Sequence, residues 1–369
     1  MFLCRSLCHF NVRFPFPGHS HYLISSKKQE IHTLYYSALS PSLQNISLQC
    51  FARSLSSNKD PSRPTDPFNN KIAHEFRFFK VYEDGTLQMF NPIHKVPPFN
   101  DPVTGVNSKD VLISSQPSIS ARVFLPFIHD PTRKLPLLFH IHGGGFCFES
   151  AFSLPHQKYL STLAAEANAI VVSVEYGLFP DRPIPACYED SWAGLQWVAT
   201  HVNGDGPESW LNEHADFEQV FVGGDSAGGN ISHNLVVRIG SMGLPGVKVV
   251  GMVLVHPYFG GTDDDKMWLY MCPSNDGLDD PRLKPSAEDL AKLGCDKILV
   301  FVSEKDHLRA VGQWYYDELK RSGWKGNVEI VENKDEGHCF HIDNLTSENS
   351  VALIKRFASF IKDEHNYIR

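Results

Sequence analysis

The sequence lacks three patterns, each of which would indicate a different class of protein. No apolar run approaches the roughly 18 residues that cross a bilayer, so no membrane span is expected. Beyond the first sixty residues there is no dense Lys/Arg stripe, and the formal charge is −8, so we expect no nucleic-acid partner. The eight cysteines include no C-x-x-C pair, so neither a zinc site nor a disulfide framework is predicted. An enzyme acting on a neutral small molecule fits this composition better.

Acidic residues are also scarce at the amino terminus. Glu30 is the only one before residue 59, among scattered basic residues and many serines. Without residues 1–60, which hold six Lys/Arg and two Asp/Glu, 28 basic and 40 acidic side chains remain, a formal charge of −12. We interpret residues 1–65 as a disordered transit peptide and linker that directs the chain to a plastid or mitochondrion. The alternative is an extension without function on a cytoplasmic protein, and a secretory signal is disfavoured because Arg5 and His9 interrupt the apolar start.

Residues 66–369 are predicted to form one α/β domain, because apolar runs alternate with helical patterns. Seven runs are predicted as strands: residues 121–125, 135–141, 169–174, 220–223, 249–255, 298–302 and 328–331. Five patterns are predicted as helices: residues 155–167, 188–201, 227–240, 310–322 and 347–362. An Asp-Gly pair at residues 84–85 predicts a hairpin between residues 78–82 and 86–90. The alternation indicates a mostly parallel sheet with helices on both faces.

One glycine-rich turn is the first candidate for chemistry. The motif G-D-S-A-G at residues 224–228 follows an apolar run and precedes a helical pattern, which places Ser226 on a tight strand-to-helix turn. That context is typical of a nucleophile elbow. Side chains at Gly224 and Gly228 are expected to clash with the flanking elements. The alternative is a glycine-rich turn with an incidental serine.

A second glycine-rich stretch, H-G-G-G-F at residues 142–146, follows the run 135–141. Glycines leave backbone N–H groups open to an oxyanion, so Gly144 and Gly145 are predicted donors together with the N–H of Ala227. His142 precedes the elbow, whereas a triad histidine in this order should follow it. We therefore expect His142 to brace the loop.

The acid and the histidine that complete a triad should lie on loops that follow the late strands, in the chain order Ser, Asp, His. Asp306 and His338 are the predicted pair, with His338 as the general base and Asp306 orienting it. Four other residues compete for these roles. They are Glu304 and Asp335 for the acid and His307 and His341 for the base. No metal is expected, because His338 and His341 lack a third ligand at suitable spacing.

Together, H-G-G-G-F, G-D-S-A-G-G-N, the S-E-K-D loop and the E-G-H turn resemble plant carboxylesterases of the hormone-sensitive-lipase-like branch of the α/β-hydrolases. The resemblance implies the α/β-hydrolase fold with a small cap from the N-terminal segment and the insertion after Phe259. It also implies the triad Ser226, Asp306 and His338, the oxyanion donors Gly144, Gly145 and Ala227, and no cofactor. Relatives in this branch include hydroxyisoflavanone dehydratases, tuliposide-converting enzymes and gibberellin receptors.

Two segments depart from the family pattern. Where relatives read Y-R-L-A-P-E, residues 176–181 read Y-G-L-F-P-D, so another group must replace the missing arginine. The insertion after Phe259 is short and contains Asp263, Asp264 and Asp265, which are expected to form a solvated loop.

The leading hypothesis is a serine carboxylesterase that hydrolyses small to medium esters through an acyl-enzyme, without metal or cofactor. A dehydratase or lactone-forming transesterase would use the same residues. A non-catalytic receptor is disfavoured by the presence of His338, since the triad histidine is replaced in the gibberellin receptors. The substrate is therefore expected to be a small-molecule ester.

Overall fold

The computed structural model describes residues 71–362. The predicted transit peptide and linker, residues 1–65, lie outside this range. Eight strands form one large sheet in the order β11-β10-β9-β8-β6-β7-β5-β4. Their bounds are β4 (Asn107–Ser115), β5 (Ser118–Leu125), β6 (Leu135–Ile141), β7 (Ile170–Glu175), β8 (Ala215–Asp225), β9 (Val249–Val255), β10 (Lys297–Ser303) and β11 (Asn327–Asn333).

The sheet is parallel from β11 to β7 and antiparallel at β5 and β4. All seven predicted strands are confirmed. Six of them are almost entirely buried over the predicted range, and strands buried on both faces appear in sequence as nearly continuous apolar runs. The edge strand β11 is mostly half-buried or exposed. The sequence prediction missed β4. Only Ser108 is buried in this edge strand, and its other residues are half-buried or exposed, so it gives a weaker signal.

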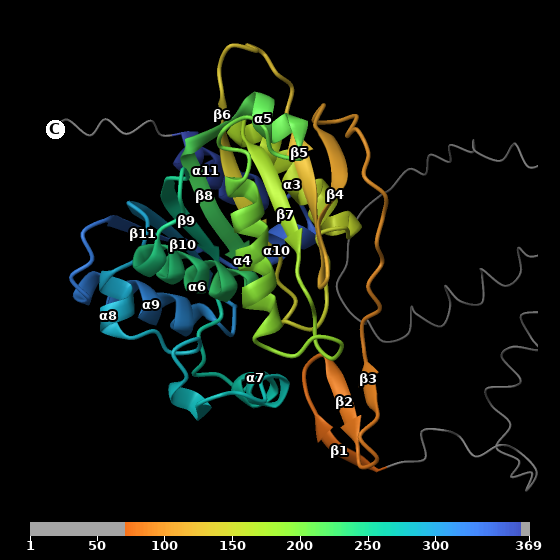
Figure 1. Ribbon diagram of the computed structural model, residues 1–369. Coiled ribbons are helices and arrows are strands. Elements are labelled where there is room, and N and C mark those ends of the chain that lie inside the picture. The colour runs from red at the N-terminus through yellow and green to blue at the C-terminus, as the bar shows by residue number, and fades with distance from the viewer. Residues whose placement is uncertain (1–70, 363–369) are drawn as a thin grey trace, which may run out of the picture. The chain divides into compact units, whose positions relative to one another are not determined.

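Helices cover both faces of the large sheet (Figure 1). On one face α3 (Leu154–Ala167) contacts α10 (Phe340–Asp343) and α11 (Glu348–Lys362). On the other face α4 (Ala186–Ala199) packs against α6 (Ala227–Met242), and α8 (Ala287–Ala291) packs against α9 (Arg309–Arg321). The five predicted helices are confirmed to within two residues. The predicted fold, a mostly parallel sheet between helical layers, is therefore correct.

A small antiparallel sheet precedes the large one and consists of β1 (Ile72–Glu75), β2 (Phe79–Tyr82) and β3 (Leu87–Met89). The predicted hairpin is formed by β2 and β3, with Gly85 at φ +83° in its turn. The short helix α7 (Asp265–Met271) lies near this sheet (Figure 1). Arg77, just before β2, bonds to Asp264, just before α7. These two segments form the predicted cap.

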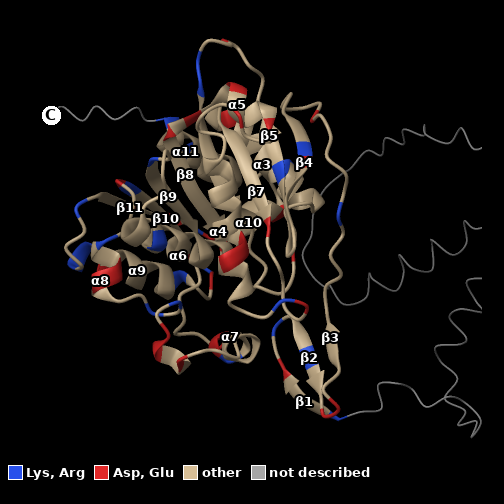
Figure 2. Cartoon of the chain, in the orientation of Figure 1, with Lys and Arg blue, Asp and Glu red and all other residues tan. Residues whose placement is uncertain are grey.

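The remaining helical elements are short: α5 (Ser209–His214) and the 3₁₀ turn η1 (Gly277–Asp279). Within residues 71–362 no helix is both long and apolar enough to cross a membrane. Acidic and basic residues are interspersed over these elements rather than gathered by sign (Figure 2).

Candidate active site

Ser226 lies between β8 and α6, at the predicted strand-to-helix turn. Its backbone has a positive φ of 53° with ψ −117°, a conformation that residues with a side chain rarely adopt. A Cβ atom on either Gly224 or Gly228 would overlap the carbonyl oxygen of Ile141 at the end of β6. Only glycine fits at these positions, because a backbone oxygen cannot move aside as a flexible side chain can. The sequence of the turn therefore fixes Ser226 at the carboxyl edge of the sheet.

Three residues from separate loops meet at this edge. His338 follows β11, and its Nε2 lies 2.9 Å from Ser226 Oγ. The Nδ1 atom of the same ring lies 2.9 Å from Asp306 Oδ2, on the loop after β10. Burial opposes the charge on Asp306, but hydrogen bonds from His307, His338 and the Leu308 N–H hold the pKa of this carboxyl well below its usual value. An ionised Asp306 can orient His338 and stabilise a positive charge on it.

The acids that competed with Asp306 lie away from His338. Asp335 is exposed, pairs with Lys305 at 3.1 Å, and donates its N–H to Glu304. Both residues belong to the structure of the loops and do not touch the histidine.

The competing histidines also have other surroundings. His341 is buried beside Tyr159 and His256, and burial lowers its pKa to about 3. His307 contacts Asp306 but not Ser226. Of the candidate bases in the described part of the chain, His338 is the one within reach of the serine hydroxyl.

The glycine loop lies beside Ser226. Gly145 and Ala227 line the same pocket as Ser226, whereas Gly144 is not among its lining residues. The N–H of Gly143 donates to Asp225 Oδ2 at 3.0 Å, so this amide is already engaged and cannot serve an oxyanion. The structure thus brings two of the three predicted donors to the pocket.

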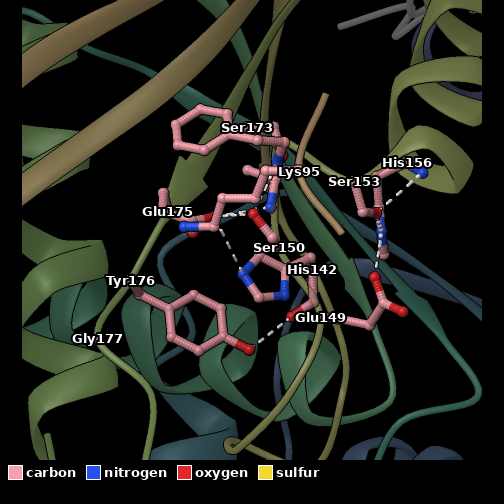
Figure 3. Close-up of polar contacts among 12 residues, drawn as sticks. Lys95, His142, Glu149, Ser150, Ser153, His156, Ser173, Glu175, Tyr176 and Gly177 are labelled. Carbon is pink, nitrogen blue, oxygen red and sulfur yellow. Dashed lines mark hydrogen bonds and ion pairs between the residues drawn. The ribbon is translucent and has the colours of Figure 1, made fainter. Parts of the chain in front are cut away.

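The loop is held from behind by His142, as expected. The His142 ring is fully buried and stacks on Tyr176 with the ring centroids 4.3 Å apart (Figure 3). The Tyr176 hydroxyl donates to the carbonyl oxygens of both His142 and Gly143. Burial lowers the pKa of His142 to about 4, so the ring is neutral at physiological pH. It acts as a packing element of the loop.

Glu175, at the end of β7, anchors the chain after this loop. It accepts hydrogen bonds from Lys95, from the hydroxyl of Ser150 and from the N–H of Ala151 (Figure 3). The start of the glycine loop is therefore held by Tyr176, just beyond β7, and the chain that follows the loop is held by Glu175 at the end of β7.

A buried charge beside the nucleophile was not predicted. Asp225 is 3% exposed, and His140 and His156 lie 3.6 and 3.8 Å from its Oδ1. Burial opposes protonation of His156, but Asp225 and Glu149 on either side raise its pKa to about 9. Asp225 thus accepts a hydrogen bond from the glycine loop and also pairs with the buried, positively charged His156. The sequence signal for this charge pair was the position of Asp225 within an otherwise apolar, buried turn, since buried carboxylates are rare without partners.

Arg182, five residues after Gly177, takes the place of the arginine that the family pattern has at residue 177. The Arg182 side chain packs against Gly177, where a Cβ would meet its Cδ at 2.7 Å. Its guanidinium donates to Asp190 at 2.9 Å, and the N–H of Gly177 donates to the other oxygen of the same carboxylate. The glycine at residue 177 makes room for Arg182.

The pocket above Ser226 is narrow and mainly apolar. Its larger side chains are Phe78, Phe146, Tyr258, Met267, Trp268 and Leu308. Its free volume is about 40 Å³, which holds only a few water molecules. Arg77, Asp264 and His307 add charged groups to the lining.

The run of three aspartates is solvated only at Asp263, so the expectation was wrong for the other two. Asp264 pairs with Arg77 and His307. Asp265 is buried and accepts a hydrogen bond from the Tyr258 hydroxyl. The partners of Asp264 lie 187 and 43 positions away in sequence, whereas Tyr258 lies seven positions from Asp265.

Two groups of potential metal ligands in the described residues contain His338. It lies with Asp306 and His307 in one group and with His256 and Cys339 in the other, the ligand atoms of each being within 4.8 Å of one another. Both nitrogens of His338 already bond within the triad geometry. A metal ion here would compete with those bonds.

Comparisons with known proteins agree with this architecture. The family described as alpha/beta hydrolase fold matches residues 138–342. The 2-hydroxyisoflavanone dehydratase of Glycyrrhiza echinata is 45% identical, over 76% of this chain and 93% of its own. An Arabidopsis thaliana protein named probable carboxylesterase 4, mitochondrial, is 42% identical, over 79% of this chain and 83% of its own.

Among solved structures, an esterase of Pyrobaculum calidifontis is similar with a TM-score of 0.58 and 28% identity, over 69% of this chain and 84% of that one. The fold, the motifs and these relatives lead to one assignment. The chain belongs to the α/β-hydrolase family, in the branch that contains plant carboxylesterases and 2-hydroxyisoflavanone dehydratases.

Proposed function

We propose that this protein is a serine carboxylesterase that hydrolyses small to medium esters through an acyl-enzyme. The observation that carries the proposal is the continuous chain of hydrogen bonds from Asp306 through His338 to Ser226 at the base of a pocket. The family relationship to esterases supports the same reaction.

In the first half of the reaction, Ser226 Oγ attacks the carbonyl carbon of the ester while His338 Nε2 takes the hydroxyl proton. Asp306 holds the ring in the tautomer that leaves Nε2 free to accept, and it stabilises the imidazolium that forms. The tetrahedral intermediate collapses when its C–O bond to the alcohol breaks and His338 returns the proton to the departing oxygen. The acyl group stays on Ser226.

The negative oxygen of the intermediate requires donors that are in place beforehand. We assign this role to the N–H groups of Gly144, Gly145 and Ala227, of which Gly145 and Ala227 line the pocket. Water then attacks the acyl-enzyme with His338 again as base, and the acid is released. Each step needs only groups of the chain and water.

Replacement of the nucleophile tests the proposal. Ser226→Ala should lower kcat by about 10⁶ on a p-nitrophenyl acyl ester, as removal of a triad serine does. Ser241→Ala, an exposed serine at the end of the same helix, should leave the rate unchanged. A Ser226→Ala variant that keeps most of its activity would contradict the proposal.

A second reaction is favoured by the 45% identity to a 2-hydroxyisoflavanone dehydratase. The same base and donors could remove water from a hydroxylated substrate, or a substrate hydroxyl could take the acyl group and form a lactone. Mass spectrometry of the products distinguishes the three outcomes as an acid, an alkene or a lactone. A panel with glycosyl esters, hydroxyisoflavanones and simple esters of graded length should be tested with residues 66–369.

We also propose that residues 66–369 are the catalytic domain and that residues 1–65 direct it to a mitochondrion or plastid. The basic, serine-rich composition of that segment supports this. The relative whose name includes a mitochondrial location supports it as well.

A further inference from the structure

The reaction proposed above makes no use of His307, although this residue adjoins the triad. Its Nδ1 lies 3.1 Å from Asp306 Oδ1, and its Nε2 lies 3.1 Å from Asp264 Oδ2. A neutral imidazole carries a single N–H, so it can donate to only one of the two carboxylates. Both contacts are hydrogen bonds only when His307 is an imidazolium.

The carboxylate of Asp306 is therefore held on both sides. Oδ2 accepts from His338, while Oδ1 accepts from the N–H of Leu308 at 2.9 Å and pairs with His307 Nδ1 at 3.1 Å. Without the second imidazole, Oδ1 would keep only the backbone donor. The carboxylate would then have more freedom to rotate away from His338.

The contacts continue from His307 to the cap. Asp264, immediately before α7, accepts at its Oδ1 from Arg77 Nε at 2.9 Å. Arg77 lies in the segment that leads into β2, and Arg77, Asp264 and His307 all line the pocket. Four groups of alternating charge, Arg77, Asp264, His307 and Asp306, thus connect both cap segments to the triad.

We propose that His307 is a positioning residue that orients Asp306 and couples closure of the cap over the pocket to the geometry of the triad. This inference rests on the proposed esterase function. The narrow pocket agrees with it, because entry of an ester larger than the free volume of about 40 Å³ requires the cap segments to move. Such movement would displace Asp264 from His307, so the position of the cap and the orientation of Asp306 would change together.

The surroundings of His307 determine its ionisation. Hydrogen bonds to Asp264 and Asp306 outweigh burial and the nearby Arg77, and they raise the pKa of His307 to about 9. The ring centroids of His307 and His338 are 5.1 Å apart. Two further acidic residues, Asp263 and Asp265, line a surface groove together with Arg77 and His307. Above this pKa one of the two carboxylate contacts is lost.

The pH profile of kcat/KM is the test, because a purely structural role would not move it. In the unaltered protein the rate should fall about tenfold as the pH rises through about 9, when a neutral His307 can no longer donate to both Asp264 and Asp306. His307→Gln should be about tenfold slower at neutral pH and show no such alkaline fall. Spontaneous hydrolysis of the ester is subtracted at each pH.

Two aspartate variants provide a matched pair. Asp264→Asn removes a negative partner of His307 and should move the alkaline fall to lower pH. Asp263→Asn removes the same charge from the neighbouring exposed position and should leave the profile in place. An unchanged profile in both His307→Gln and Asp264→Asn would overturn the inference.

Thermal unfolding gives a second measurement, which does not depend on catalysis. The folded pKa of His307 lies above its usual 6.5, so its contribution to stability is complete below about pH 6.5 and lost as the pH rises through about 9. The difference in Tm between the unaltered protein and His307→Gln should shrink over that interval. If Ser226→Ala abolishes hydrolysis while His307→Gln changes neither measurement, only the role of His307 fails; retained activity in Ser226→Ala would reject the esterase proposal itself.

Discussion

At the scale of single residues, the candidate site depends on backbone positions that only particular residues can occupy. Ser226 and Gly145 both have positive φ angles, 53° and 56°. Ser226 is held there by the close approach of β6 to the elbow. Gly145 is free to adopt this conformation, and it lines the same pocket as Ser226. The geometry of the loop therefore depends on the absence of a side chain.

Gly145→Ala tests that dependence. The new Cβ would collide with the Phe78 ring, and alanine is strained at φ 56°. The loop should shift and misplace its donor, so kcat should fall by about 10² with little change in KM, as for loss of one oxyanion donor. Steady-state kinetics on a short ester measure both parameters.

A double variant supplies the control. Gly145→Ala combined with Phe78→Ala removes the ring that the new methyl group would meet. Part of the lost kcat should return if collision with Phe78 is a cause. A Gly145→Ala enzyme with unchanged kcat would show that this amide does not stabilise the oxyanion.

At the scale of elements, the pocket is formed by a rigid sheet edge and a cap of two short segments. Met267 and Trp268 come from α7, whereas Phe78 comes from the N-terminal segment. Met267 is 4% exposed, and its Cε would lie 3.4 Å from a Cβ on Gly145. Its flexible side chain therefore fills space directly beside the glycine loop.

Met267→Ala should enlarge the pocket and change the preferred ester length. Removal of three heavy atoms leaves room for additional methylene groups, and one methylene in such a pocket changes kcat/KM by about tenfold or more. The ratio of kcat/KM for butanoate over acetate esters should rise by about tenfold. The p-nitrophenyl series measures this ratio.

Met271→Ala is the matched control on the same helix. Met271 is fully buried but does not line the pocket. This variant should lose about 2–5 kcal/mol of stability without a change in the ratio. An equal ratio in the two variants would mean that Met267 does not limit the length of the ester.

At the scale of the whole molecule, the fold was predictable because most of the sheet is buried on both faces and its strands stand out as apolar runs. The order of the motifs along the chain also predicted which loops carry Ser226, Asp306 and His338, since parallel strands place their carboxyl ends at one edge. The order of the motifs favoured His338 over His307 without excluding His307, since both are close to candidate acids. In the structure His338 lies within reach of Ser226 Oγ and His307 does not.

The cap was the least predictable part, because its contacts join residues far apart in sequence. Arg77 and Asp264 are separated by 187 positions, and no local sequence pattern predicts that they pair. Asp265 and Tyr258 are only seven positions apart, but the run of acidic residues looked like a solvated loop and did not predict their hydrogen bond. Long-range pairing of charges, rather than local propensity, determines this part of the site.

The N-terminal segment can be tested separately from the catalytic domain. Residues 71–362 contain their own buried core and every group of the candidate site, so residues 66–369 should fold and hydrolyse esters with the same kcat/KM as the full chain. Residues 1–65 fused to a fluorescent protein should enter mitochondria or plastids of plant cells. The same fusion with Arg5, Arg13, Lys27, Lys28 and Arg53 replaced by glutamine should stay in the cytoplasm, because transit peptides depend on their basic residues. Identical distributions of the two fusions would reject the targeting role and leave the esterase proposal intact, since the enzyme assay uses the domain alone.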